Sequence, residues 1–232
     1  MRNLLQHITK IQIATAIAIL FHFFGVIGIL FWDKNFFIGN TPLNLLLMLG
    51  LLWWTQENRN FSFILFAAIA MFTGFAVEVI GVNTGMLFGN YYYGNVMGLK
   101  WKNVPLLIGA NWWITIYCCG ILVHTLLDKI VYRLHEEKGA LVPKLKVLSI
   151  IVDGATLAVA FDWLMEPVAV KLGFWFWKGD GSIPLYNYIC WFIISAILLS
   201  FFHFSAFPKR NKFAIHLLLI QAMFFLLLRS FL

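Results

Sequence analysis

Two carboxylic acids, Asp162 and Glu166, lie four residues apart in a segment that is otherwise almost free of charge. Residues four apart are neighbours on one face of a helix, so their side chains would lie roughly 6 Å from each other. Where water is excluded, desolvation favours the protonated form of one carboxyl group, while a neighbouring carboxylate stays ionised. Such a pair could donate one proton to a substrate and accept another from water.

A third acid, Glu78, lies near the end of an earlier apolar segment. An Asp at the centre of a membrane helix costs about 2.5–3.5 kcal/mol on insertion scales, so buried acids are functional candidates. We expect Glu78, Asp162 and Glu166 to meet at one depth, near the outer interface, as the catalytic group. Asp153, nine residues before Asp162, would point to the opposite side of the helix. The alternative is that the acids only hydrogen-bond across the bundle.

The elements that carry these acids are predicted to be membrane helices. Hydrophobic residues make up 62% of the 232 residues and charged residues only 12%, against roughly 25% charged in soluble domains. A spanning helix needs about 20 mostly apolar residues. Seven segments qualify, the second being short enough to be re-entrant: 11–31, 42–55, 62–82, 105–127, 147–170, 184–204 and 213–230. The predicted fold is an all-α polytopic bundle forming one integral-membrane domain over residues 1–232.

The net charge of +7 comes from basic residues between the spans, which argues against a nucleic-acid surface. Eleven of the 17 Lys and Arg residues, Arg2 among them, fall on the side of the N-terminus. The positive-inside rule then predicts a multi-pass protein of the cell (inner) membrane with its N-terminus in the cytoplasm. The long polar segment 128–146 is predicted to be a cytoplasmic loop that contains some amphipathic helix.

Two loop motifs, FGNYYYG from Phe88 and LGFWFWK from Leu172, are related by an offset of 84 residues. The same offset relates Glu78 to Asp162. After each motif a proline opens a span and a tryptophan follows seven residues later: Pro105 and Trp112, then Pro184 and Trp191. Internal repeats in membrane proteins place a site at the interface of the two units. Chance is the alternative, since 18% of the chain is aromatic.

Trp and Tyr residues gather near the same loops. Such residues collect at membrane interfaces in any case, but some could line a pocket beside the acids and stabilise a carbocation by cation–π attraction. We expect a group of polar and aromatic residues to bind the substrate: Asn83, Tyr93, Asn111, Trp112, Trp175, Trp177, Asn187 and Trp191. The three cysteines are expected to be buried, and the six histidines lack metal-ligand spacing, so no metal site is expected.

Four segments together resemble the membrane carotenoid 1,2-hydratase family, which includes bisanhydrobacterioruberin hydratase. These segments are EVIGVNTGMLFGNYYYG from Glu78, VPLLIGANWW from Val104, DWLMEPVAVKLGFWFW from Asp162 and IPLYNYICW from Ile183. The similarity spans about residues 62–204. Many family members have Asp before the proline where this chain has Glu166, so the carboxyl is kept but its reach is longer.

The resemblance implies a hydro-lyase of carotenoid biosynthesis. It would add water to the terminal C1=C2 double bond of an acyclic carotenoid end group, of the lycopene or gamma-carotene type. The expected partners are the carotenoid in the bilayer, water and other enzymes of the carotenoid pathway, with no nucleic acid.

Acid-catalysed hydration suggests roles for these residues. Protonation of C2 gives a tertiary cation at C1 that water captures, which requires an acid, a base and no cofactor. We expect Asp162 to donate the proton and Glu166 or Glu78 to orient and deprotonate the water. The water-holding candidates are Asn83 and Asn111, and the candidates to face the cation are Tyr93, Trp112 and Trp175. A lycopene-cyclase-like enzyme and a non-enzymatic proton-coupled carrier or receptor stay open as alternatives.

Overall fold

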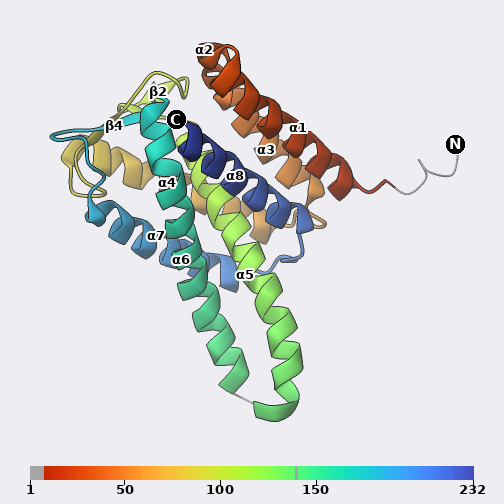
Figure 1. Ribbon diagram of the computed structural model, residues 1–232. Coiled ribbons are helices and arrows are strands. Elements are labelled where there is room, and N and C mark those ends of the chain that lie inside the picture. Colours follow the sequence, from red (N-terminus) through yellow and green to blue (C-terminus); the bar gives the residue numbers. More distant parts are fainter. Residues whose placement is uncertain (1–7, 139–140) are drawn as a thin grey trace, which may run out of the picture.

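The computed structural model describes residues 8–138 and 141–232, with side chains described outside 131–144. Arg2, which entered the count for orientation, lies outside the described residues. Figure 1 shows a helical bundle, which confirms the predicted all-α membrane fold. Its helices are α1 (Lys10–Phe31), α2 (Lys34–Gly39), α3 (Thr41–Thr55), α4 (Phe61–Thr84), α5 (Ile108–Lys138), α6 (Leu141–Lys171), α7 (Leu185–Phe204) and α8 (Lys212–Phe231).

Among the described helices, six are long and apolar enough to cross a membrane: α1, α4, α5, α6, α7 and α8. The second predicted span corresponds to α3, a shorter apolar helix of 15 residues. Every predicted span thus coincides with a helix, and α2 is an additional short helix between the first two.

Local sequence signals set several helix ends. Thr9 caps α1 in a capping box with Gln12, and the side chain of Asn60 caps α4 by accepting from the backbone N–H of Phe63. Such caps satisfy N–H groups that have no partner inside the helix. At the other end of α4, Gly85 adopts a left-handed conformation with φ of 69°, which glycine allows without steric cost.

The polar segment 128–146 is largely helical. The prediction of a loop with some amphipathic helix was therefore wrong about how much of the segment is loop. Helix α5 continues to Lys138 and α6 begins at Leu141, and the two project beyond the rest of the bundle as a hairpin (Figure 1). The segment is rich in Lys, Leu and Glu, which are strong helix formers. Asp128 on α5 pairs with Lys146 on α6 and with His124 one turn before it.

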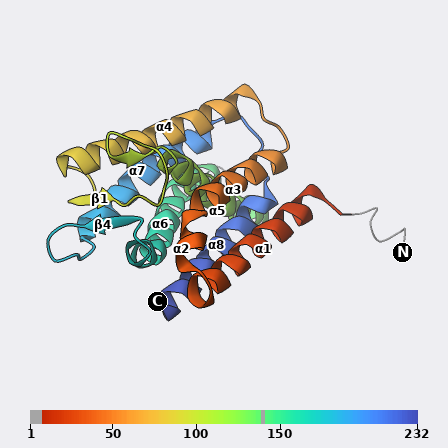
Figure 2. The same cartoon turned by 90° about the horizontal axis from the view of Figure 1, so that it is seen from above.

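The helices alternate in direction, so the α4–α5 and α6–α7 connections meet at the end of the bundle away from the hairpin. Seen from above, α1 lies on the opposite side of the bundle from α4, with α8 and α6 between them (Figure 2). The two connections contribute the strands β1 (Tyr91–Tyr93), β2 (Lys100–Trp101), β3 (Val104–Pro105) and β4 (Trp175–Trp177). Strand β1 pairs with β4, and β2 pairs with β3, both antiparallel.

The two loop motifs related by 84 residues pair with each other. Tyr91 lies opposite Trp177 and Tyr93 opposite Trp175. The flanking hydrogen bonds, from the Gly94 N–H to the Phe174 carbonyl and from the Lys178 N–H to the Asn90 carbonyl, are both 2.9 Å long and are equivalent under the same offset. The two connections are therefore related by an approximate two-fold axis that passes between the paired strands.

Candidate active site

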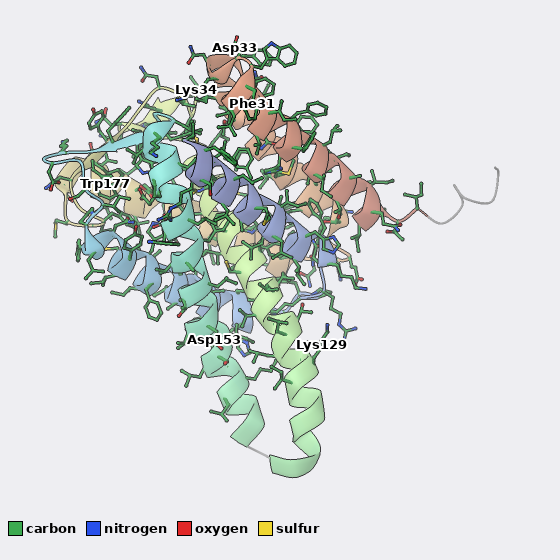
Figure 3. The ribbon with its side chains drawn as sticks, in the orientation of Figure 1. Phe31, Asp33, Lys34, Lys129, Asp153 and Trp177 are labelled. Atoms are coloured by element: carbon green, nitrogen blue, oxygen red, sulfur yellow. The ribbon has the colours of Figure 1, made fainter. Side chains whose placement is uncertain are left out.

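The three predicted acids lie together at the end of the bundle that holds β1 and β4. The exposed fraction is 1% for Asp162, 3% for Glu166 and 5% for Glu78, and all three line one small cavity. Asp153 is exposed and accepts a 2.5 Å hydrogen bond from Ser149. Figure 3 shows Asp153 far along α6 toward the hairpin, away from Trp177. The structure thus brings the three predicted acids together and leaves Asp153 outside.

Glu78 on α4 accepts three hydrogen bonds from aromatic side chains. The hydroxyls of Tyr91 and Tyr93 donate to its Oε2 at 2.5 and 2.8 Å, and Nε1 of Trp112 donates to its Oε1 at 2.9 Å. Alternate residues of a strand face the same side, which aims both tyrosines at Glu78 and leaves Tyr92 exposed. Three donors suit the carboxylate form, which only accepts hydrogen bonds.

The two tyrosines act as stable donors in this arrangement. Burial, and after it the neighbouring charge of Glu78, raise the pKa of both Tyr91 and Tyr93 well above the usual value. Both phenols consequently keep their protons at neutral pH and continue to donate to Glu78.

Glu166 on α6 is held in a similar way by the second strand. Nε1 of Trp175 and Nε1 of Trp177 donate to its Oε2 at 2.9 and 3.1 Å. The amide of Asn187 on α7 lies 3.4 Å from its Oε1, a long contact. The indole N–H can only donate, so Oε2 of Glu166 must act as an acceptor.

Asp162 differs from the other two acids. Its Oδ2 accepts a 2.9 Å hydrogen bond from Nδ2 of Asn187, but its Oδ1 is buried with no hydrogen-bond partner among the described residues. Buried polar atoms nearly always have a partner, so an exception needs an explanation. A proton carried on Oδ1, or a bound water or substrate, would supply one.

The cavity between the acids has a volume of about 20 Å³. A single water needs roughly 10–15 Å³ of such space and several polar partners, so one water fits here. Its walls carry the three acids, the amides of Asn111 and Asn187, and a set of larger side chains: Phe88, Tyr91, Tyr93, Ile108, Met165, Trp175, Trp177 and Trp191.

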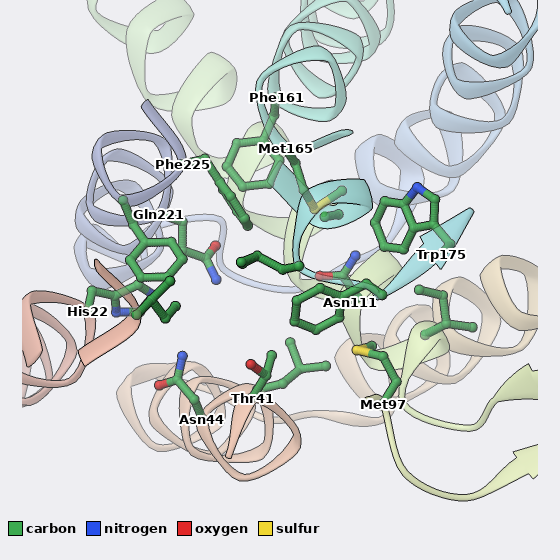
Figure 4. A pocket seen from close by; sticks show the side chains of 17 residues that line it. His22, Thr41, Asn44, Met97, Asn111, Phe161, Met165, Trp175, Gln221 and Phe225 are labelled. Carbon is green, nitrogen blue, oxygen red and sulfur yellow. The ribbon is translucent and has the colours of Figure 1, made fainter. Parts of the chain in front are cut away.

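A second cavity of about 100 Å³ adjoins the first. The two share the walls formed by four residues: Ile108, Asn111, Met165 and Trp175. Most of its lining is apolar, with Trp175 at one end of the view in Figure 4 and His22 and Gln221 at the other. A small polar space and a larger apolar one therefore meet beside Asp162 and Glu166.

Seven of the eight predicted substrate-binding residues lie at this site. Six line the cavity of the acids: Tyr93, Asn111, Trp175, Trp177, Asn187 and Trp191. Trp112 lies behind it, fully buried, and stacks on Trp191 with ring centroids 3.8 Å apart and planes 10° apart. This stack joins α5 to α7 at equivalent positions of the two repeated patterns.

Asn83 does not lie at the site. Five residues beyond Glu78, it is turned by about 140° around the helix and is exposed. Its Nδ2 donates to the Lys102 carbonyl at 2.9 Å, and its Oδ1 accepts from Asn103 at 3.2 Å. The structure thus gives Asn83 a role in holding the loop before β3, and the expectation that it holds a catalytic water is not supported by its position.

Four residues of the cavity were missed: Phe88, Tyr91, Ile108 and Met165. Tyr91 could have been found, because Tyr91 and Tyr93 share a face if the YYY motif is a strand. Met165 could also have been predicted. It lies three residues after Asp162, and therefore on nearly the same face of the helix, and it directly precedes Glu166.

All three cysteines are buried, as predicted. Within the part of the chain that the structure describes, no three His, Cys, Asp or Glu residues are grouped so as to hold a metal ion.

The fold and the site define a polytopic membrane protein with a buried group of acids next to an apolar cavity. The chain belongs to the family of carotenoid biosynthesis proteins, whose model matches residues 40–232. The match includes α3 to α8 and therefore every acid of the site. No curated protein and no solved structure matches the chain. The protein accordingly has a role in carotenoid biosynthesis, which implies an enzyme of that pathway.

Proposed function

We propose that the protein is a carotenoid 1,2-hydratase, which adds water to the terminal C1=C2 double bond of an acyclic carotenoid end group. The observation that carries this proposal is the adjacency of the two cavities. One has room for a single water among three buried acids, and the other is an apolar space for the end of a hydrocarbon. Hydration needs water and alkene side by side, with bulk water excluded.

Asp162 is the proton donor in this proposal. Its Oδ1 is the acid oxygen at the site that has no hydrogen-bond partner among the described residues, whereas Glu78 and Glu166 accept from indole or phenol donors on fixed strands. The O–H bond of Asp162 breaks as a C–H bond forms at C2 of the alkene. The positive charge then resides on C1, a tertiary carbon.

The surroundings stabilise this cation in two ways. The aromatic rings of Tyr93, Trp175 and Trp177 line the cavity, and the face of an aromatic ring attracts a cation by about 0.5–2 kcal/mol. The carboxylates left on Asp162 and Glu78 add a favourable charge interaction, which is strong where water is scarce.

The bound water completes the reaction. Its oxygen forms a bond to C1, and the proton that it loses passes to Glu166, whose Oε1 has, within the described residues, only the long contact to Asn187. Asn111 lines both cavities, which supports the proposal that it holds the water between them. When a proton returns from Glu166 to Asp162 through the next water, the net change is the addition of one water to the alkene.

The proposal is tested by expressing the protein in a bacterium that makes lycopene and measuring pigment masses. A hydratase gives a pigment heavier by one water per modified end. A pigment of unchanged mass but altered structure would instead indicate the cyclase-like reaction. Unaltered pigment together with proton-coupled uptake into vesicles would indicate a carrier.

We further propose the orientation that the basic residues predict, with the N-terminus in the cytoplasm of the cell membrane. The site and the C-terminus would then lie toward the outer side. Reporter fusions at the C-terminus and in the hairpin loop test this, since the hairpin loop should report a cytoplasmic position and the C-terminus an external one.

A further inference from the structure

We propose that the carotenoid enters laterally from the bilayer, through a groove between α1, α2 and α3 that leads to the acids. The identity of the ligand, a linear polyene ending in an alkene, rests on the proposed function. The route itself rests on three spaces that follow one another in the structure, from the lipid-facing surface to Asp162.

The outermost space is the groove, with a volume of about 480 Å³. Its outer wall consists of large apolar side chains that are exposed on α1, α2 and α3: Leu20, Phe21, Phe24, Phe36 and Leu43. In a helix bundle that spans a membrane, such side chains face lipid tails. A hydrocarbon ligand dissolved in the bilayer could thus reach this surface without crossing water.

The groove continues inward. It shares Ile29, Thr41, Asn44 and Phe224 with the 100 Å³ apolar cavity, which in turn adjoins the cavity of the acids through Met165. In Figure 4, Thr41 and Asn44 lie on the α3 side of the inner cavity, away from Trp175, which also lines the cavity of the acids. An extended chain threaded along this path would place its end group beside Asp162.

Phe224 on α8 is one of the residues that line both the groove and the inner cavity. Its ring meets His22 edge-on, with centroids 5.4 Å apart. A Cβ atom added at Gly25 would lie 3.1 Å from Cε2 of Phe224, so glycine at this position leaves the space that the ring occupies. Because its ring lies at the junction of the two spaces, we assign Phe224 as the gate of the proposed entrance, which opens when this side chain rotates.

Asn44 supplies the second indication of a ligand. Its Oδ1 is buried at the junction of the two spaces and has no hydrogen-bond partner in the described part of the chain. An unpaired acceptor of this kind is costly unless a donor reaches it. The hydroxyl group of the hydrated end group is such a donor, so Asn44 is placed to contact the alcohol as it leaves by the same path.

The test uses the full chain, purified and placed in lipid nanodiscs, with lycopene as the probe. Retained lycopene is measured by its visible absorption after repurification. In Gly25→Leu the new side chain fills the groove and holds Phe224 in place, so we expect about tenfold less bound lycopene, as overpacking of a filled space implies. Gly50→Leu is the matched control, because a Cβ there meets nothing within 4 Å, and it should bind as the wild type does.

A second pair of variants guards against misfolding of Gly25→Leu. Leu43 and Leu46 are both exposed on α3, but only Leu43 lines the groove. Leu43→Trp should reduce lycopene binding and Leu46→Trp should not. Equal binding in Leu43→Trp and Leu46→Trp would overturn the entrance, and so would wild-type binding in a folded Gly25→Leu.

The two proposals fail in different ways. If the wild type binds lycopene without hydrating it, and the groove variants lose that binding, the entrance stands and the hydratase function falls. If groove and control variants both bind and hydrate lycopene as the wild type does, the hydratase function stands and the entrance falls.

Discussion

The two connections at the site end of the bundle resemble each other in form but differ in chemistry. In both, a helix presents an acid and a three-residue strand presents two aromatic donors to it, tyrosines to Glu78 and tryptophans to Glu166. The first unit holds one acid with three donors, whereas the second adds Asp162, one turn before Glu166, with one oxygen that has no hydrogen-bond partner in the described part of the chain. The comparison teaches that similar scaffolds can surround one carboxyl with strand donors and leave an oxygen of another without a donor among the described residues.

The difference arises from helical spacing. The offset of 84 residues relates Glu78 to Asp162, but in the second unit the strand donors reach the acid one turn further along, Glu166. Among the residues that the structure describes, Asp162 therefore has a single donor, Asn187. An extra acid in one of two similar units is thus sufficient to make the pair chemically unequal.

The largest expected effect is that of Asp162→Asn, which removes the proposed proton donor from the second unit and leaves Glu166 in place. General acid catalysis contributes typically 10²–10⁴-fold, so hydrated pigment should fall by about 100-fold or more in a lycopene-producing host. Asp153→Asn, on the same helix but exposed, is the control and should give the wild-type amount. Unchanged product in Asp162→Asn would remove Asp162 from the role of acid.

Next comes the contrast of Glu166→Gln with Glu78→Gln, which compares the two units directly. Loss of the base should lower the yield of hydrated pigment by about 100-fold. Loss of the Glu78 charge removes only an electrostatic contribution, and we expect about tenfold. The reverse order would assign the base to the first unit.

The last comparison concerns single strand donors, whose loss is expected to act on stability and not directly on the chemical step. Tyr93→Phe and Trp177→Phe each remove one hydrogen bond to a carboxylate, which contributes about 1.5–3 kcal/mol to the free energy of unfolding. Both should lower the melting temperature. Tyr92 is exposed and directed away from the acids, so Tyr92→Phe should leave the melting temperature unchanged. An equal decrease in Tyr92→Phe would show that the hydrogen bonds to the carboxylates do not add to stability.

Much of this architecture could be predicted from the sequence, because hydrophobic length fixes membrane helices closely. Six predicted spans match long helices, and the short second one matches α3. The distance of each acid from the following loop was sufficient to place Glu78, Asp162 and Glu166 at one depth.

The remaining features depend on contacts between distant residues. Strands β1 and β4 are three residues long, too short for a periodic signal, and their pairing is fixed only when the helices pack. Which oxygen of Asp162 stays without a partner depends on Asn187, which lies on another helix. Asn83 was assigned to the site wrongly because it is close to Glu78 in the sequence. Its side chain lies on a different face of α4, which points away from the cavity.

The most direct test of the account is the reaction of lycopene with the purified protein in D₂O. Proton donation by Asp162 to C2, followed by capture of water at C1, predicts a product with a hydroxyl on C1 and one non-exchangeable deuterium on C2, and almost no such product from Asp162→Asn. A product with deuterium but no added oxygen, or an oxygenated product without deuterium on carbon, would contradict hydration through a protonated alkene.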